Sequence, residues 1–213
     1  MPLGICGRTG SGKSTIIQCI FRTIEPDTGS SIVIDGIDIL QLGLNDLRSK
    51  LGIIPQDPVL FSGTIRRNLD PFDQYDDQTL WDCLEKAAMK DKILEMGQQG
   101  LESIVQPYGE NFSIGQRQLL CLARALVRKP KILICDEMSA SVDYKTDEKI
   151  QLYLRQELKG CTLLTIAHRL STIMDYDKIL VLDDGSIVQF GPPQQLLLDT
   201  DGQFFKMVHS SSD

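Results

Sequence analysis

This chain of 213 residues has no long apolar run, no paired cysteines and no cluster of basic residues. No segment approaches the roughly 18 apolar residues of a membrane-spanning helix, and no signal peptide is expected before the first motif. The six cysteines form no C-x-x-C pair and there are only two histidines, so neither zinc nor disulfides are expected. Buried thiols in a reducing compartment are the better expectation. The net charge of −7, with dispersed basic residues, argues against a nucleic acid partner.

Short apolar segments alternate with helical patterns along the chain. This alternation predicts an α/β fold with an open, mostly parallel sheet flanked by helices. Expected strands are 3–6, 51–54, 132–135, 162–166, 179–182 and 187–190, the last two joined by a hairpin turn at 183–185. Helices are expected over 13–22 and 79–88, and the apolar stripe of the second consists of Leu80, Cys83, Leu84, Ala87 and Ala88.

The first motif has the spacing of a phosphate-binding loop and follows an expected strand. Its residues are Gly7, Arg8, Thr9, Gly10, Ser11, Gly12, Lys13, Ser14 and Thr15. Glycines let successive backbone N–H groups face one concavity, and the following helix adds positive potential there. Lys13 is placed to contact the β- and γ-phosphates, and Ser14 to offer its hydroxyl to Mg²⁺. Nucleotide binding is the prediction, although the loop alone does not name the reaction.

A pair of acids ends the apolar strand expected at 132–135. In a protein with a phosphate loop, Asp136 at such a strand end is placed to hold Mg²⁺, directly or through water. Its neighbour Glu137 is placed to polarise the water that attacks the γ-phosphate. The alternative is an acidic strand end that is simply hydrated at the surface.

A segment upstream of these acids combines a helix start with an unusual first turn. Ser113 is a good N-cap, Pro130 stops the helix, and the buried face is expected to consist of Leu119, Leu122, Ala123 and Leu126. A capped buried helix does not explain why Ser113, Gly115 and Gln116 crowd the turn whose N–H groups attract anions. At this segment the chain resembles the nucleotide-binding domain of ATP-binding-cassette (ABC) transporters, whose signature motif it matches.

Other segments match the same family in the same order. Residues 53–61 resemble its Q-loop, with Gln56 the side chain that reaches Mg²⁺ or the lytic water. Residues 139–143 resemble the D-loop, and residues 165–169 the loop of the switch histidine, here His168. Residues 61–72 and 109–113 resemble most closely the second cassette of the multidrug-resistance-associated, subfamily C, transporters.

The resemblance implies a phosphate-loop ATPase with ATP and Mg²⁺ as its ligands. The ATPase core would comprise residues 1–60 and 131–213, and a helical subdomain about 61–130 would carry the signature. Ser14, Gln56 and Asp136 would surround the metal, while Glu137, His168 and Gln56 would serve hydrolysis. Ser113, Gly115 and Gln116 would bind the ATP of a second cassette in a head-to-tail dimer with two ATP molecules.

The same resemblance implies a place in the cell and a set of partners. Transmembrane domains of one transporter would be moved by the dimer, so the cassette would sit at the cytoplasmic face of a membrane and power export. The alternative is a truncated or regulatory cassette that binds nucleotide weakly without turnover. A DNA-repair ABC ATPase would need a coiled-coil insertion, for which the spacing from Ser14 to Ser113 leaves no room. A translation-type ABC factor would usually carry two cassettes in one chain.

Three departures from the family pattern stand out. The antiparallel strands and the adenine-stacking aromatic residue that normally precede the loop are absent, so an N-terminally truncated chain with an incomplete antiparallel subdomain is expected. Residues 106–108, Gln-Pro-Tyr, replace a usual acidic residue and glycine, which bears on contacts with the transmembrane partner. Met138 replaces a small residue.

Overall fold

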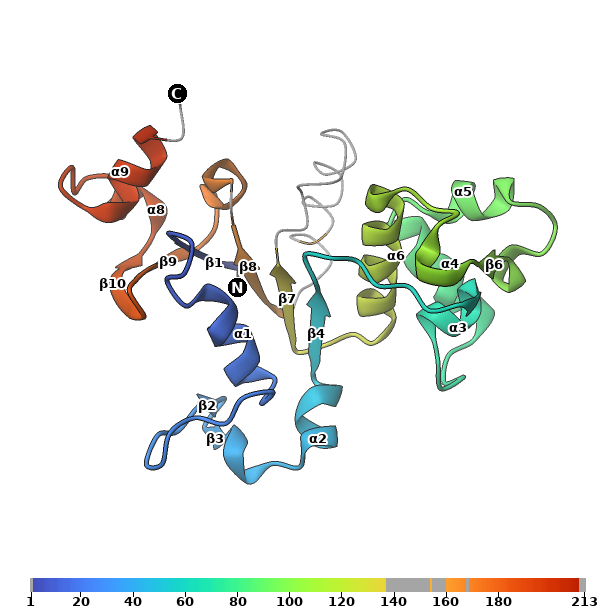
Figure 1. Ribbon diagram of the computed structural model, residues 1–213, viewed down its shortest axis with the longest axis horizontal. Helices are drawn as coiled ribbons and strands as arrows, with labels where there is room; N and C mark the ends of the chain where they lie inside the picture. Colours follow the sequence, from blue (N-terminus) through green and yellow to red (C-terminus); the bar gives the residue numbers. More distant parts are fainter. Residues whose placement is uncertain (1, 137–153, 155–159, 168, 211–213) are drawn as a thin grey trace. The chain divides into compact units, whose positions relative to one another are not determined.

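The computed structural model describes residues 2–136, 154, 160–167 and 169–210. The main feature of these residues is a six-stranded sheet. The strand order is β10-β9-β1-β8-β7-β4 (Figure 1). The strands are β1 (Pro2–Gly7), β4 (Leu51–Ile54), β7 (Ile132–Asp136), β8 (Thr162–Ile166), β9 (Lys178–Asp183) and β10 (Ser186–Gly191). β1 pairs in parallel with β8 and β9, and β10 pairs antiparallel with β9. The predicted α/β fold with a mostly parallel sheet is confirmed.

The chain divides into two compact units, which are described separately. Unit 1 comprises Met1–Leu51, Lys131–Ile134 and Cys161–Asp213, and unit 2 comprises Gly52–Pro130 and Cys135–Gly160. Along the chain, the division falls inside β4 and inside β7.

Unit 1 is built on its parallel strands, whose middle residues are buried. Its main core consists of Ile5, Ile17, Ile134, Leu164, Ile166 and Leu182. Helix α1 (Lys13–Ile20) packs Ile16, Ile17 and Ile20 against this core, as its apolar spacing predicts. The helix ends before the predicted residue 22, because Arg22 has a φ of 49° that a right-handed helix does not allow. Its guanidinium instead donates to the carbonyls of Ile39 and Leu42.

Shorter elements complete unit 1. They are β2 (Val33–Ile34), β3 (Ile37–Asp38), η1 (Ile39–Gln41), α2 (Leu44–Ser49), η5 (Leu170–Ile173), α8 (Pro193–Leu196) and α9 (Gln203–Ser210). The predicted hairpin joins β9 to β10, and its turn residues Asp184 and Gly185 have φ of 44° and 73°. Two consecutive positive φ values are typical of the primed turns that match strand twist.

Unit 2 is mainly helical in its described part. Its elements are β5 (Gly63–Thr64), α3 (Ile65–Leu69), α4 (Asp77–Lys86), α5 (Lys90–Glu95), η2 (Gly100–Glu102), β6 (Ile104–Val105), η3 (Pro107–Gly109) and α6 (Ile114–Val127). Helix α6 packs against α3 and α4 (Figure 1). The four residues predicted for its buried face, Leu119, Leu122, Ala123 and Leu126, are all buried.

Helix α4 differs from the predicted range 79–88 at both ends. It starts at Asp77, because the Asp76 carboxylate accepts a hydrogen bond from the Thr79 N–H and caps the first turn. It ends at Lys86, and Ala88 is exposed with a φ of 55°. Leu80, Cys83, Leu84 and Ala87 are buried as predicted, whereas assigning Ala88 to the buried stripe was wrong.

The structure bears on the expectations about disulfides, metal sites and membrane-spanning helices. None of the six cysteines forms a disulfide; five of them are buried and Cys19 is half-buried. Within the described ranges, no group of histidine, cysteine and acidic side chains has the proximity that a metal site requires. No helix in these ranges combines the length and apolar character needed to cross a bilayer.

Candidate nucleotide-binding site

The loop between β1 and α1 has a backbone shape that only glycines can supply. Gly7, Gly10 and Gly12 have φ of 153°, 83° and 98°. A Cβ on Gly7 would lie 2.2 Å from the carbonyl oxygen of Leu182 on the neighbouring strand β9. The loop therefore lies directly against β9 at Gly7, where both conformation and space require glycine, whereas Gly10 and Gly12 are favoured by their positive φ alone.

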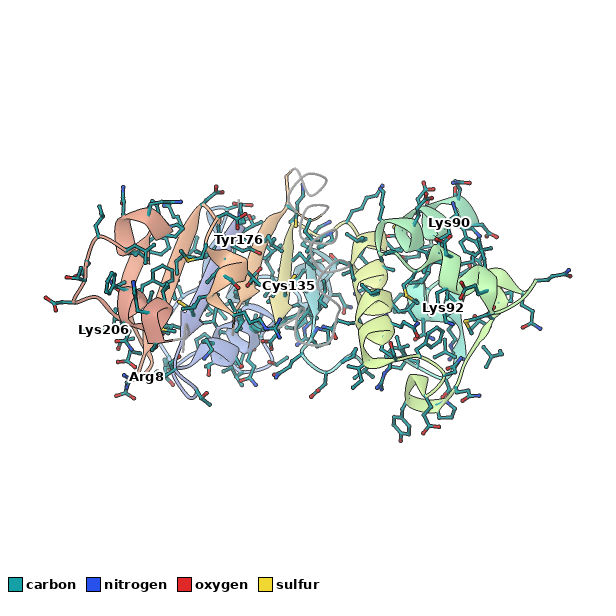
Figure 2. All side chains as sticks on the ribbon, turned by 90° about the horizontal axis from the view of Figure 1, so that it is seen from above. Arg8, Lys90, Lys92, Cys135, Tyr176 and Lys206 are labelled. Atoms are coloured by element: carbon teal, nitrogen blue, oxygen red, sulfur yellow. The ribbon has the colours of Figure 1, made fainter. Side chains whose placement is uncertain are left out.

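Lys13 places a cation inside this loop. Its side chain is buried, and its Nζ donates to the carbonyl oxygens of Gly7 at 2.9 Å and Arg8 at 2.8 Å. These two hydrogen bonds hold the ammonium group over the loop at the start of α1. Arg8 itself is exposed at the surface of unit 1 (Figure 2).

The first turn of α1 offers further groups to an anion. Gly12 occupies the N-cap position and has no side chain to bond the first N–H groups, which therefore stay available together with the positive end of the helix dipole. The hydroxyls of Ser14 and Thr15 lie on this exposed turn. Ser11 is buried, and its Oγ has no hydrogen-bond partner among the described residues. This donor set fits a phosphate chain, and a Ser14 hydroxyl beside it fits a divalent cation.

A second contact holds the loop from the side of the β9–β10 hairpin. The N–H of Gly185 donates to the carbonyl of Ser11 at 3.2 Å. A Cβ on Gly12 would come within 3.7 Å of the Gly185 Cα. The hairpin turn thus packs against the loop, a contact that sequence spacing did not indicate.

Cys6 precedes the loop on β1 and is fully buried. Burial raises the pKa of its thiol to about 12, although the nearby Lys13 ammonium acts in the opposite direction. The thiol is therefore protonated at neutral pH, and a protonated thiol is a poor nucleophile and a poor metal ligand.

The predicted metal ligands Gln56 and Asp136 lie at or just after strand ends. Asp136 is the last residue of β7 and is half-buried. Gln56 lies two residues after β4 with an exposed side chain. The carbonyl of Pro55, one residue earlier, accepts a 2.8 Å hydrogen bond from Gln118 on α6. Gln118 was not singled out in the sequence because the two residues are 63 positions apart.

The signature residues form the N-terminus of α6, as predicted. Ser113 is the N-cap, and its Oγ accepts from the Gln116 N–H at 3.2 Å. The Gln116 Oε1 in turn accepts from the Ser113 N–H at 3.0 Å, which completes a capping box. Ser113 is exposed and Gly115 is half-buried, so the backbone at the N-terminus of α6 lies at the surface of unit 2.

The predicted residues fall into three groups. The loop residues 7–15 lie together in unit 1, whereas unit 2 contains Gln56, Ser113, Gly115, Gln116 and Asp136. Glu137, His168 and the D-loop segment 139–143 lie outside the described residues.

A glycine-shaped loop between a central parallel strand and a helix, with a lysine ammonium over it, defines the phosphate-loop class of α/β nucleotide-binding proteins. The family model "ABC transporter" matches residues 2–140, and the chain belongs to this family. Members of the family bind ATP.

The chain is similar to ATP-binding cassette sub-family C member 2 of Rattus norvegicus, with 54% identity over 97% of this chain and 13% of that protein. It is 53% identical to ABC transporter C family MRP4 of Zea mays, over 99% of this chain and 14% of that protein. It therefore spans about one seventh of the length of these curated relatives. The solved structure of a bacterial Atm1-family ABC exporter with ATP bound matches 99% of this chain and 36% of its own, with a TM-score of 0.93 and 37% identity. The resemblance to subfamily C is confirmed.

Proposed function

We propose that this chain is the ATP-binding and ATP-hydrolysing cassette of a membrane transporter that exports its substrate. The observation that carries the proposal is the buried Lys13 ammonium, bonded to the carbonyls of Gly7 and Arg8 at the start of α1. A cation and free N–H groups at one helix end are the elements that a triphosphate requires.

Binding would use the loop residues 7–15. The backbone N–H groups would bond phosphate oxygens, and Lys13 would turn from the carbonyls of Gly7 and Arg8 toward the β- and γ-phosphates. Ser14, Gln56 and Asp136 are the residues proposed to hold Mg²⁺, which when bound neutralises charge on the phosphate oxygens.

Hydrolysis would depend on three side chains. Glu137 would orient or deprotonate the attacking water, and Gln56 would help to position it. His168 would contact the γ-phosphate and stabilise the charge that develops there.

The cycle would need a second cassette and transmembrane domains. Ser113, Gly115 and Gln116 would present the exposed N-terminus of α6 to the partner's ATP, so that ATP closes a head-to-tail dimer and hydrolysis opens it. Support comes from the similarity to subfamily C transporters and to an exporter with ATP bound.

The test compares Lys13→Met with Lys90→Met. Lys13→Met keeps the aliphatic stem and removes the charge, whereas Lys90 is a surface lysine of α5 paired with Glu85 (Figure 2). We expect Lys13→Met to weaken Mg-ATP binding by about 10- to 100-fold, since hydrogen bonds to charged groups contribute about 1.5–3 kcal/mol. Lys90→Met should bind as the unmodified protein does.

Isothermal titration calorimetry with Mg-ATP measures ATP binding, and a phosphate-release assay measures ATP hydrolysis. Equal affinity in the two variants would refute the assignment of the phosphate loop. Binding without phosphate release by the unmodified protein, in the presence of a partner cassette, would favour the alternative of a regulatory cassette.

A further inference from the structure

One face of α6 bonds the backbone on both sides of Gln56. Gln118 reaches the carbonyl of Pro55, and Arg124 reaches the carbonyl of Val59 at 3.1 Å. Helix α6 and the segment 55–59, both in unit 2, are thus joined at two points six residues apart on the helix. Figure 1 shows this segment passing from β4 toward α3 alongside α6.

Gln118 is an unusual residue for its position. Its side chain is 1% exposed, and the other buried residues of α6 are leucines, alanines, a valine and Cys121. Its Nε2 bonds Pro55, while its Oε1 is buried without a hydrogen-bond partner in the described part of the chain. Burying an amide with one atom unsatisfied is unfavourable for stability, so the fold alone gives little reason for glutamine here.

The second anchor is a network around Arg124. Its guanidinium also donates to the backbone carbonyl of Asn68 at 2.7 Å and to the Asn68 Oδ1 at 3.0 Å. The same Asn68 side chain bonds the N–H and the carbonyl of Phe61 at 2.8 and 2.7 Å. Val59 and Phe61 are therefore held to α3 and α6, which fixes the far end of the segment.

Between the anchors, the backbone has few free torsions. The rings of Pro55 and Pro58 fix two φ angles, and Pro58 also restricts Asp57 to extended conformations. Gln56 and Asp57 have exposed side chains on this short stretch. The position of the Gln56 backbone is consequently set by α6, and chiefly by Gln118 at the adjacent carbonyl.

We propose that Gln118 is a positioning residue for ATP hydrolysis, which acts through Gln56 by tying its backbone to the signature helix. This inference rests on the proposed function of Gln56. Loss of the bond would let Gln56 move without disturbing residues 7–15, so turnover would fall while nucleotide affinity would stay.

The experiment uses Gln118→Met in the intact protein, with Leu122→Met as the matched control. Both changes place methionine at a buried position of α6, but Leu122 contributes only packing. Kd for Mg-ATP, kcat and the Mg²⁺ concentration at half-maximal rate are measured for both, alone and combined with Gln56→Ala. Thermal unfolding checks that both variants fold.

The expected result for Gln118→Met is a kcat about tenfold lower, a raised Mg²⁺ requirement and an unchanged Kd, with no further loss in the Gln56→Ala background. Leu122→Met should leave all three values unchanged. An equal kcat in Gln118→Met and unmodified protein, or an additive loss with Gln56→Ala, would overturn the positioning role alone. An unmodified protein that binds Mg-ATP but releases no phosphate with its partner cassette would overturn the proposed hydrolysis and this inference with it.

Discussion

The phosphate loop should tolerate an added methyl group at Gly10 far better than at Gly7. Both glycines have positive φ, so each alanine variant carries a backbone strain of about 1–3 kcal/mol. At Gly10 the added Cβ meets no atom within 4 Å. At Gly7 it would lie 2.2 Å from the Leu182 carbonyl oxygen and 2.7 Å from the Ser11 Oγ.

The clash at Gly7 cannot be relieved by a side-chain rotation. Leu182 is the direct partner of Gly7 in the parallel β1–β9 pair, so its carbonyl moves only if the pairing moves. Overpacking of this kind costs about 1–3 kcal/mol beyond the strain that both variants share. At about 2–4 °C per kcal/mol for a chain of this size, Gly7→Ala should unfold roughly 2–12 °C below Gly10→Ala.

Circular dichroism melts of the two variants measure this difference directly. The unmodified protein serves as the common reference, and Mg-ATP titrations test whether Gly7→Ala also loses binding. Coincident melting curves for Gly7→Ala and Gly10→Ala would refute the view that β9 shapes the loop.

Three further predictions concern the residues of catalysis, association and thiol chemistry. Glu137→Gln should keep ATP binding and slow phosphate release about 100-fold in single-turnover assays, because an amide lacks the basicity of a general base; normal release would assign the base elsewhere. The Gly115→Asp variant should bind ATP as a monomer but should not associate with a partner cassette in gel filtration with ATP, because it brings a carboxylate to the N-terminus of α6, where the partner's phosphate would bind. Loss of ATP binding by the monomer would contradict this prediction. Burial raises the pKa of Cys6 to about 12, so iodoacetamide at pH 8 should label half-buried Cys19 first and Cys6 only after unfolding. Peptide mass spectrometry measures this order, and labelling of Cys6 before Cys19 would contradict the prediction.

Local signals in the sequence were sufficient for the strands of the six-stranded sheet and for helices α1, α4 and α6, whereas the shorter elements were not predicted. The loop and the capped start of α6 depend on residues a few positions apart, and Ser113 caps the helix as its spacing predicts. Helix ends were predicted less well. Helix α1 ends at Ile20, and the Arg22 guanidinium bonds the carbonyls of Ile39 and Leu42, contacts that the local pattern does not encode.

Contacts across long sequence separations could not be predicted from one sequence. The bond from Gln118 to Pro55 and the contact of Gly185 with Ser11 join segments that become neighbours only after the sheet and helices assemble. The one available signal, a glutamine among the apolar residues of a buried helix, calls for a polar partner but was not used in the prediction. The roles of Glu137 and His168 stay predictions.

The contact between Gly185 and Ser11 makes the β9–β10 turn a poor place for protein engineering. Surface hairpins usually accept affinity tags, fluorescent-protein insertions and new chain termini, because loop length costs little. Here any lengthening between Asp184 and Gly185 would pull the donor N–H away from the Ser11 carbonyl. The turn around Gly29, which has no atom within 4 Å of an added Cβ, is the better insertion point on the same unit.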